Sequence, residues 1–200
     1  MLLKNDKHIL PLAKRIKRLA VVGTAADDLG VQCGGWTIAW QGRSGNTTKG
    51  TTILAAIRKA AGSANVTYSE DGSGAQDASV AIAVIGETPY AEMRGDRENL
   101  NLDPEDLAVV EKLTRVGVPV VVVLVSGRPL AIDDILPKAD ALVAAWLPGT
   151  EGDGVADVLF GKTKPAGKLS FTWPKGSSTS FHLGDPGYET LFPFGSGMSW

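Results

Sequence analysis

The chain has 200 residues, of which 44% are hydrophobic and 21% charged, and its formal net charge is −2 at pH 7. This length suits one domain with a sizeable hydrophobic core, and the balanced charge argues against a nucleic-acid footprint or an anionic membrane partner. No apolar run is long enough to span a bilayer, and the single cysteine, Cys33, excludes an internal disulfide or a cysteine-rich metal site.

Apolar runs alternate with segments of helical periodicity along the chain. The apolar runs predict strands at residues 19–23, 66–69, 81–85, 118–125, 141–146 and 168–172. The periodic segments predict helices at residues 51–60, 103–115, 131–136 and 150–160, with Thr51 as the N-cap of the first. Continuous apolar strands between helices indicate an α/β fold with a mainly parallel sheet. We expect a three-layer sandwich, flavodoxin-like or Rossmann-like in general form.

Both ends of the chain have the character of interior sequence. Residues 1–5 place no basic region before their apolar residues and therefore do not form a signal peptide. The chain stops on an aromatic residue, Trp200, without a polar tail. We expect residues 1–200 to be a single α/β domain excised from a larger protein, with residues 174–200 forming an irregular C-terminal loop.

One carboxylate follows a predicted core strand directly. Glu87 stands two residues after the apolar run 81–85. Ligand sites in open α/β sheets lie outside the carboxyl ends of the strands, so Glu87 could be a catalytic acid. From this stretch alone, a helix cap or a surface charge is the favoured interpretation. Polar loops at residues 126–129 and 148–152 follow two further strands, and we expect all three loops to converge on one edge of the sheet.

Two tryptophans, Trp36 and Trp40, lie on a glycine-bounded loop. The flat apolar face of an indole on such a loop can stack against the C–H face of a pyranose ring. The alternative is that the indole fills the hydrophobic core. We expect Trp40 to do so, whereas Trp36 fits both interpretations.

Several common chemistries have no support in the sequence. There is no Gly-x-Ser-x-Gly motif, and the two histidines, His8 and His182, lie near the ends of the chain, which disfavours serine catalysis and metal hydrolysis. Gly23 begins no dinucleotide fingerprint, and no phosphate loop is present, so we expect no cofactor. The remaining candidates are carboxylates and tryptophans, which are the residue types that commonly form the active sites of enzymes acting on sugars. A retaining glycosidase needs two carboxyl groups about 5–5.5 Å apart. The sequence indicates Glu87 as one of them and no second carboxylate in a comparable context.

Motifs spread over nearly the whole chain match one known family in order. They are LLKN (2–5), LPL (10–12), AVVG (20–23), CGGWTI (33–38), WQG (40–42), GE (86–87), PY (89–90), GD (95–96), NL (99–100), SGRP (126–129), AAWLPG (144–149), EG (151–152), LFG (159–161) and LFPFG (191–195). On these motifs the chain resembles the second, α/β-sandwich domain of glycoside hydrolase family 3. The resemblance is greatest to the β-glucan exohydrolase and β-glucosidase branch.

The resemblance implies a retaining, exo-acting enzyme that hydrolyses terminal β-D-glucosyl linkages. Its nucleophilic aspartate would lie on an N-terminal barrel domain, and the second domain would supply the acid/base glutamate and an aromatic wall for the leaving sugar. By motif, Glu87 is the general acid/base and Trp36 the substrate-binding aromatic. Glu92 is the rival acid/base because the same loop holds both glutamates, but the Gly-Glu-x-Pro-Tyr context favours Glu87.

The resemblance also implies partners and a location. The substrates would be β-glucan oligosaccharides or β-glucosides, and the parent protein would be periplasmic or extracellular, although this chain carries no signal. Two hundred residues cannot hold the barrel, so the isolated chain is expected to be inactive. We interpret three charged residues as structural, namely Arg97, Arg128 and Glu151. The alternative function is a noncatalytic carbohydrate-binding or partner-binding module of the same fold.

Overall fold

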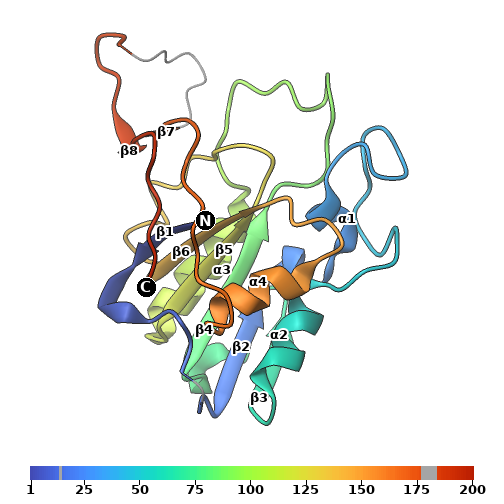
Figure 1. Ribbon diagram of the computed structural model, residues 1–200, viewed down its shortest axis with the longest axis vertical. Helices are drawn as coiled ribbons and strands as arrows, with labels where there is room; N and C mark the ends of the chain where they lie inside the picture. Colours follow the sequence, from blue (N-terminus) through green and yellow to red (C-terminus); the bar gives the residue numbers. More distant parts are fainter. Residues whose placement is uncertain (14, 177–183) are drawn as a thin grey trace.

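A six-stranded sheet forms the centre of the computed structural model, which describes residues 1–13, 15–176 and 184–200 (Figure 1). The strand order is β1-β6-β5-β4-β2-β3. The strands are β1 (Leu2–Asn5), β2 (Arg18–Val22), β3 (Asn65–Ser69), β4 (Val80–Gly86), β5 (Val120–Val125) and β6 (Ala141–Trp146). All neighbouring pairs are parallel except β1 and β6, which are antiparallel. The expected mainly parallel α/β sheet is therefore confirmed.

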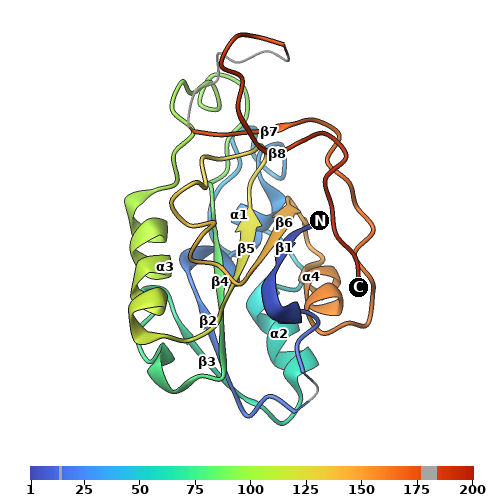
Figure 2. The ribbon, with the colours of Figure 1, turned by 90° about the vertical axis from the view of Figure 1, so that its left-hand side faces the viewer.

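Helices cover both faces of this sheet. They are α1 (Leu29–Cys33), α2 (Ile53–Ala61), α3 (Pro104–Val116) and α4 (Gly152–Leu159). Figure 2 shows α3 on one side of the sheet and α2 and α4 on the other. Within the described residues, no helix combines the length and the apolar character needed to cross a membrane.

The two hydrophobic cores arise from alternation along β4 and β5. In β4, Ala81, Ala83 and Ile85 face the α3 side, whereas Ile82 and Val84 face the α2 and α4 side. Every residue of β5 is buried, as is every residue of β4 before its final glycine. Burying one such large side chain contributes roughly 1.5–3 kcal/mol, so the two central strands are the most firmly held elements of the sheet.

The ends of the helices follow local capping rules. Thr52, rather than the expected Thr51, caps α2 because its hydroxyl accepts the Ala55 N–H at 3.1 Å. Pro104 occupies the first turn of α3, and Gly117 ends that helix with a left-handed φ of 74°.

Three short elements differ from the sequence-based expectation. Residues 133–138 form turns, and the helix expected at residues 131–136 is absent. Pro137 lacks an N–H and so disfavours a helix here. The expected strand at 168–172 is absent, and the short strand β7 (Trp173–Pro174) pairs instead with β8 (Thr190–Phe192). The strand β1, which we did not expect, adds an antiparallel edge. These elements depend on long-range partners that local patterns do not reveal.

Candidate active site

Glu87 is held where β4 leaves the sheet. A Cβ atom at Gly86 would lie 1.7 Å from the Val125 carbonyl oxygen of β5, so only glycine fits at this position. The N–H of Glu87 donates to the same Val125 carbonyl at 3.1 Å. The two central strands therefore fix the backbone of Glu87 at the carboxyl edge of the sheet, as expected from its position in the sequence.

Three side chains surround the Glu87 carboxylate. The Tyr90 hydroxyl donates to Oε2 at 3.0 Å, and Arg97 Nη1 and Arg128 Nε each lie 3.3 Å from Oε1. Only 5% of the Glu87 side chain is exposed. Two guanidinium groups and a phenol thus hold one nearly buried carboxylate, and the desolvation cost of burying its charge is offset by these contacts.

Arg128 and Tyr90 form a unit beside this carboxylate. Arg128 Nε donates to the Tyr90 hydroxyl at 2.7 Å, and the guanidinium carbon lies 4.0 Å from the centre of the Tyr90 ring. Burial, together with the negative charge of Glu87, raises the pKa of Tyr90. The phenol therefore stays protonated at neutral pH and remains a donor to Glu87.

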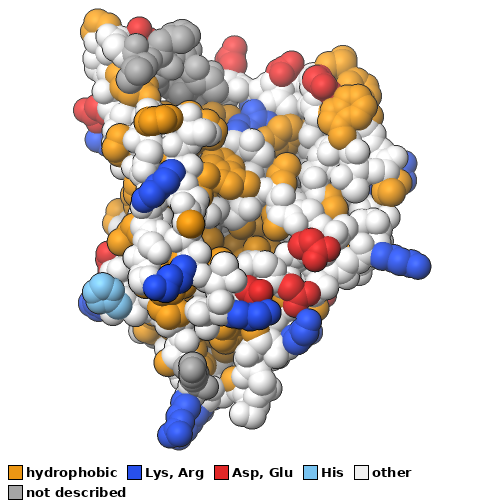
Figure 3. All heavy atoms as spheres, in the orientation of Figure 1, with side chains coloured by type: hydrophobic (Ala, Val, Ile, Leu, Met, Phe, Trp, Pro, Cys, Tyr) orange, Lys and Arg blue, Asp and Glu red, His pale blue; other side chains and the backbone are white. Residues whose placement is uncertain are grey.

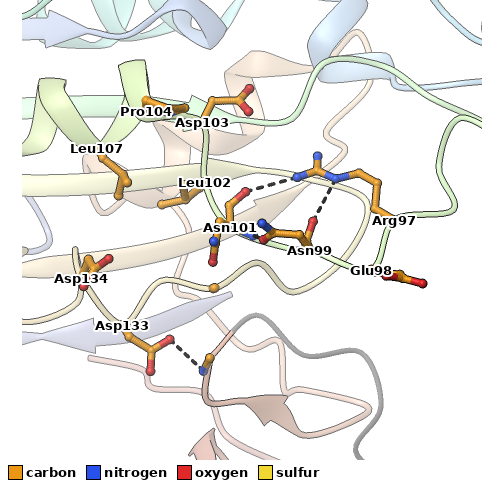
Figure 4. Close-up of a pocket in the computed structure, with 12 residues that line it drawn as sticks. Arg97, Glu98, Asn99, Asn101, Leu102, Asp103, Pro104, Leu107, Asp133 and Asp134 are labelled. Atoms are coloured by element: carbon orange, nitrogen blue, oxygen red, sulfur yellow. Dashed lines mark hydrogen bonds between the residues drawn. The ribbon is translucent and has the colours of Figure 1, made fainter.

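Arg97 connects Glu87 to a second hollow. Its Nε donates to the Asn99 carbonyl at 3.1 Å and its Nη2 to the Asn101 carbonyl at 3.2 Å (Figure 4). This larger pocket, of about 900 Å³, is lined mainly by polar residues of 97–104 and 131–134. Neither Glu87 nor Trp36 lines it. It therefore lies beside the candidate active site rather than within it.

Glu87 and Trp36 line one common pocket of about 230 Å³. The pocket is completed by Val31 of α1, by the glycines that follow this helix and by residues after the ends of β4, β5 and β6: Gly34, Gly35, Thr88, Pro89, Tyr90, Gly127 and Leu147. Glu87 forms ion pairs with two arginines and also lines this pocket. Its carboxylate is therefore not enclosed away from the cleft. The structure thus brings together the two side chains that the motifs nominate.

Trp36 reaches this pocket because two loops interlock. A Cβ atom at Gly35 would lie 2.2 Å from the Tyr90 carbonyl oxygen, and one at Gly42 would lie 2.5 Å from the Pro89 Cβ atom. Trp36 itself has a φ of 62°, and 70% of its surface is exposed. A bulky residue in this left-handed region is uncommon, and an exposed indole without a core contact is a frequent feature of binding surfaces.

The expectation that Trp40 fills the core is wrong. Trp40 is 46% exposed, and its ring centre lies 6.2 Å from that of Trp36 at an interplanar angle of 51°. Its indole Nε1 donates to Glu92 Oε2 at 2.7 Å. The loop stands above the edge of the sheet, too far from the core for the ring to be buried there, and the indole N–H finds its acceptor on the neighbouring loop.

The structure separates the two glutamates of this loop. Glu92 is exposed and accepts the indole hydrogen bond, whereas Glu87 is buried and lines the pocket. Hydrogen bonds from the Trp40 indole, from the Glu92 backbone and from the Trp36 indole lower the pKa of Glu92. A carboxylate with a lowered pKa is the opposite of what a general acid needs at neutral pH.

A third carboxylate, Asp106 of α3, lies beneath Glu87. Asp106 is 6% exposed and accepts the Gly86 N–H at 3.0 Å. Burial raises the pKa of Asp106 to about 7. Five carboxylates line an adjacent pocket of about 280 Å³, namely Asp28, Glu87, Asp103, Glu105 and Asp106. The sequence shows acidic residues in the first turn of this helix but does not indicate that one of them is buried.

The structural interpretation of three charged residues needs refinement. Glu151 is exposed and accepts a hydrogen bond from the Thr150 hydroxyl at 3.1 Å, which fits a structural role. Arg97 and Arg128 instead contact Glu87 directly. The proximity of Arg128 follows from topology, since it comes after β5, the neighbour of β4, whereas no sequence signal indicates the contact with Arg97.

These features define a mainly parallel α/β domain with a buried carboxylate and an exposed tryptophan at one sheet edge. The chain belongs to the glycosyl hydrolase family 3 C-terminal domain family, whose model matches residues 1–200. The family resemblance expected from the motifs is therefore confirmed, and with it the assignment of the chain as the second domain of such glycoside hydrolases.

Named relatives share the whole length of the chain or most of it. A lysosomal beta glucosidase from Dictyostelium discoideum is 33% identical over 100% of this chain and 28% of its own length. A periplasmic beta-glucosidase from Salmonella typhimurium is 32% identical over 88% of this chain and 27% of its own length. A beta-xylosidase from Formosa agariphila is 30% identical over 100% of this chain and 32% of its own length.

Solved structures agree with this assignment. The exo-1,3/1,4-beta-glucanase (ExoP) from a Pseudoalteromonas species matches with a TM-score of 0.89 and 39% identity, covering 99% of this chain and 27% of that one. A beta-glucosidase from Listeria innocua in complex with glucose matches with a TM-score of 0.82 and 27% identity, covering 100% of this chain and 32% of that one. The chain thus spans about a third or less of the relatives it matches.

Proposed function

We propose that this domain supplies the general acid/base and an aromatic wall to the active site of a retaining, exo-acting β-glucosidase or β-glucan glucohydrolase. Glu87 is the acid/base, and Trp36 stacks on the sugar that leaves. The observation that carries this proposal is the single pocket lined by both side chains at the carboxyl edge of the sheet. The names of the relatives support the class of reaction.

The reaction divides into two steps in this proposal. Glu87 first gives its proton to the glycosidic oxygen while a nucleophilic aspartate on an N-terminal barrel domain attacks the sugar. Glu87 then takes a proton from water, which hydrolyses the covalent glycosyl-enzyme. Tyr90 and Arg128, which contact the carboxylate, hold its oxygens in position for both transfers. The parent protein would be periplasmic or extracellular.

The experiment is the Glu87→Ala variant of the full-length protein. Hydrolysis of a β-linked glucose disaccharide should slow by roughly 10²–10⁴-fold, the usual loss when a general acid/base is removed. β-Glucosyl fluoride needs no proton to leave, and azide needs no base to attack. With azide present, this substrate should therefore react nearly as fast as in the parent enzyme. Unchanged disaccharide hydrolysis in Glu87→Ala would refute the assignment.

A noncatalytic carbohydrate-binding or partner-binding module is the second candidate function. The observation that favours it is that both Glu87 oxygens have partners within the domain, as a structural carboxylate would. In that case Glu87→Ala should weaken the stability of the domain without the azide rescue. The two candidates therefore give opposite results in the same set of measurements.

A further inference from the structure

The side chain of Glu92 contacts Trp40, one of the two exposed tryptophans of the neighbouring loop. Its Oε2 accepts the Trp40 indole N–H at 2.7 Å, and the Trp36 indole contributes to the lowered pKa of Glu92. Hydrogen bonds with one ionised partner are short and stronger than neutral ones. Glu92 is therefore a charged acceptor for the Trp40 indole, and the pocket that contains Glu87 and Trp36 does not include Glu92.

The backbone beneath Glu92 is fixed by Gln41. The Gln41 side-chain amide donates to the Glu92 carbonyl at 2.9 Å and accepts the Ala91 N–H at 3.0 Å. The same loop residue thus ties two consecutive residues of the Glu87 loop to the tryptophan loop. Because the main chain of Glu92 is held in this way, its carboxylate can fix the position of Trp40.

Trp36 has little other support. Trp36 is 70% exposed, and Ile38 of its own loop and Met93, which follows Glu92, are 81% and 72% exposed. The Trp40 ring packs against the Trp36 ring, and the backbone N–H of Trp36 donates to the backbone carbonyl of Trp40 at 2.9 Å. An aromatic side chain that is not already ordered must lose rotamer freedom when a ligand stacks on it, which weakens binding.

We propose that Glu92 is a positioning residue for sugar binding, which holds Trp40 against Trp36 and so fixes the aromatic face that receives the leaving sugar. This inference rests on the proposed function of the domain and gives the second glutamate of the loop a separate task. Glu92 transfers no proton. It acts through the two indoles, so its effect belongs to binding of the leaving sugar and not to the chemical step.

The first test compares two substrates in the full-length protein. Glu92→Ala should raise KM for a β-linked glucose disaccharide by about 3- to 10-fold, in line with the loss of one hydrogen bond, with kcat nearly unchanged. β-Glucosyl fluoride carries no leaving sugar, so both of its constants should stay at the parent values. Glu92→Gln should restore KM, because the amide oxygen still accepts the indole N–H.

The matched control is Glu98→Ala. Glu98 lies six residues further along the same loop, is exposed, and its side chain makes no hydrogen bond or ion pair with another described residue. Its removal takes away the same charge and should leave KM for the disaccharide unchanged. An equal rise in KM for Glu92→Ala and Glu98→Ala would overturn the proposal, since loop charge alone would then explain the effect.

The second test detects the indole contact without measuring activity. Trp40→Phe keeps an aromatic ring but lacks the indole N–H, so adding Glu92→Ala to it should raise KM no further. In protein labelled with 5-fluorotryptophan, the ¹⁹F resonance that disappears in Trp40→Phe should shift in Glu92→Ala and stay in place in Glu98→Ala. An unshifted resonance in Glu92→Ala would overturn the proposal even if Glu87 is the acid/base.

The kinetic outcome also separates the two glutamates. A large fall in kcat with azide rescue in Glu92→Ala would show that Glu92 carries the proton and would overturn both assignments. An unchanged KM for the disaccharide in Glu92→Ala, together with the expected loss of activity in Glu87→Ala, would overturn only the positioning role.

Discussion

Asp106 is the residue whose ionisation matters most for the stability of the site. Its carboxylate is buried under the end of β4 and accepts the Gly86 N–H, and its pKa is raised to about 7 from the usual 3.8. In the unfolded chain the same group ionises near its usual value. At a pH between these two values, Asp106 therefore carries a proton in the folded domain, whereas the same carboxyl group is ionised in the unfolded chain. Above about pH 7, the folded domain must instead hold a buried negative charge.

We expect the free energy of unfolding of the chain to fall as the pH rises from about 4 to about 7. A raised carboxyl pKa means that the folded state binds more protons in this window, so its stability is lost as the pH rises through it. About three pH units correspond to at most roughly 4 kcal/mol. Asp106→Asn removes this dependence while the amide oxygen still accepts the Gly86 N–H, and urea unfolding at pH 5 and pH 8 measures it.

Asp134→Asn is the control for this measurement, because Asp134 is an exposed carboxylate far from β4 in the chain. It should keep the pH dependence of the parent. If Asp106→Asn and the parent chain lose stability equally between pH 5 and pH 8, Asp106 ionises like a surface carboxylate and the inference from burial is wrong.

The sequence predicts some residues of the site and not others. Glu87 is nominated by its place after a buried strand and by its motif, and Arg128 could be placed near it once the strand order is known. Arg97 and Asp106 could not, because their contacts depend on the path of a long loop and on the depth of one helical turn. Trp40 was misplaced because a pattern of glycines and aromatics does not distinguish an exposed ring from a buried one.

At the scale of elements, the close approach of β4 and β5 is the feature that the site depends on. The predicted central strands are confirmed because residues buried on both faces leave a continuous apolar run in the sequence. The short elements at residues 131–136 and 168–172 were predicted wrongly because a few residues carry too little periodicity to decide their structure. The edges of the fold are therefore harder to predict than its centre.

Gly86→Ala should disrupt this close approach. The added Cβ would lie 1.7 Å from the Val125 carbonyl oxygen, so the ends of the two strands must move apart. We expect a loss of about 1–3 kcal/mol or more in the free energy of unfolding, the usual range for overpacking. Gly154→Ala in α4 is the control, because open space surrounds its Cβ position. It should stabilise the chain by about 0.5–1 kcal/mol. Similar unfolding free energies for the two variants would contradict this account of β4.

At the scale of the whole molecule, the surface above the carboxyl edge of the sheet is unusually apolar for a free domain. Figure 3 shows hydrophobic side chains gathered at the upper right, over the loops that follow α1 and β4. Trp36, Ile38 and Met93 are each at least 70% exposed. This surface lies beside the Glu87 pocket, and its exposure agrees with the proposal that a further domain completes the active site.

The carboxylates near Glu87 show why the chain by itself should not hydrolyse glycosides. A retaining mechanism needs a second, ionised carboxylate about 5–5.5 Å from the acid/base. The pocket shared with Trp36 is lined by no other aspartate or glutamate among the described residues. In the adjacent pocket, Asp28 caps α1 through the Val31 N–H at 2.8 Å and also accepts the Gly45 N–H at 2.7 Å. Asp106 is engaged by Gly86 and is partly protonated at neutral pH.

We therefore expect the purified 200-residue chain to hydrolyse an aryl β-glucoside no faster than buffer does. The assay should run at pH 5, 6 and 7, so that a nucleophile with an unusual pKa is not missed. Asp28→Asn, Asp103→Asn, Glu105→Gln and Asp106→Asn serve as probes if activity is found. Turnover that any of these substitutions abolishes would place the nucleophile within this chain and refute the proposal of a barrel-borne aspartate. Turnover that survives all four would point to a contaminating enzyme, because these four are the only other carboxylates among the described residues lining the two pockets that contain Glu87.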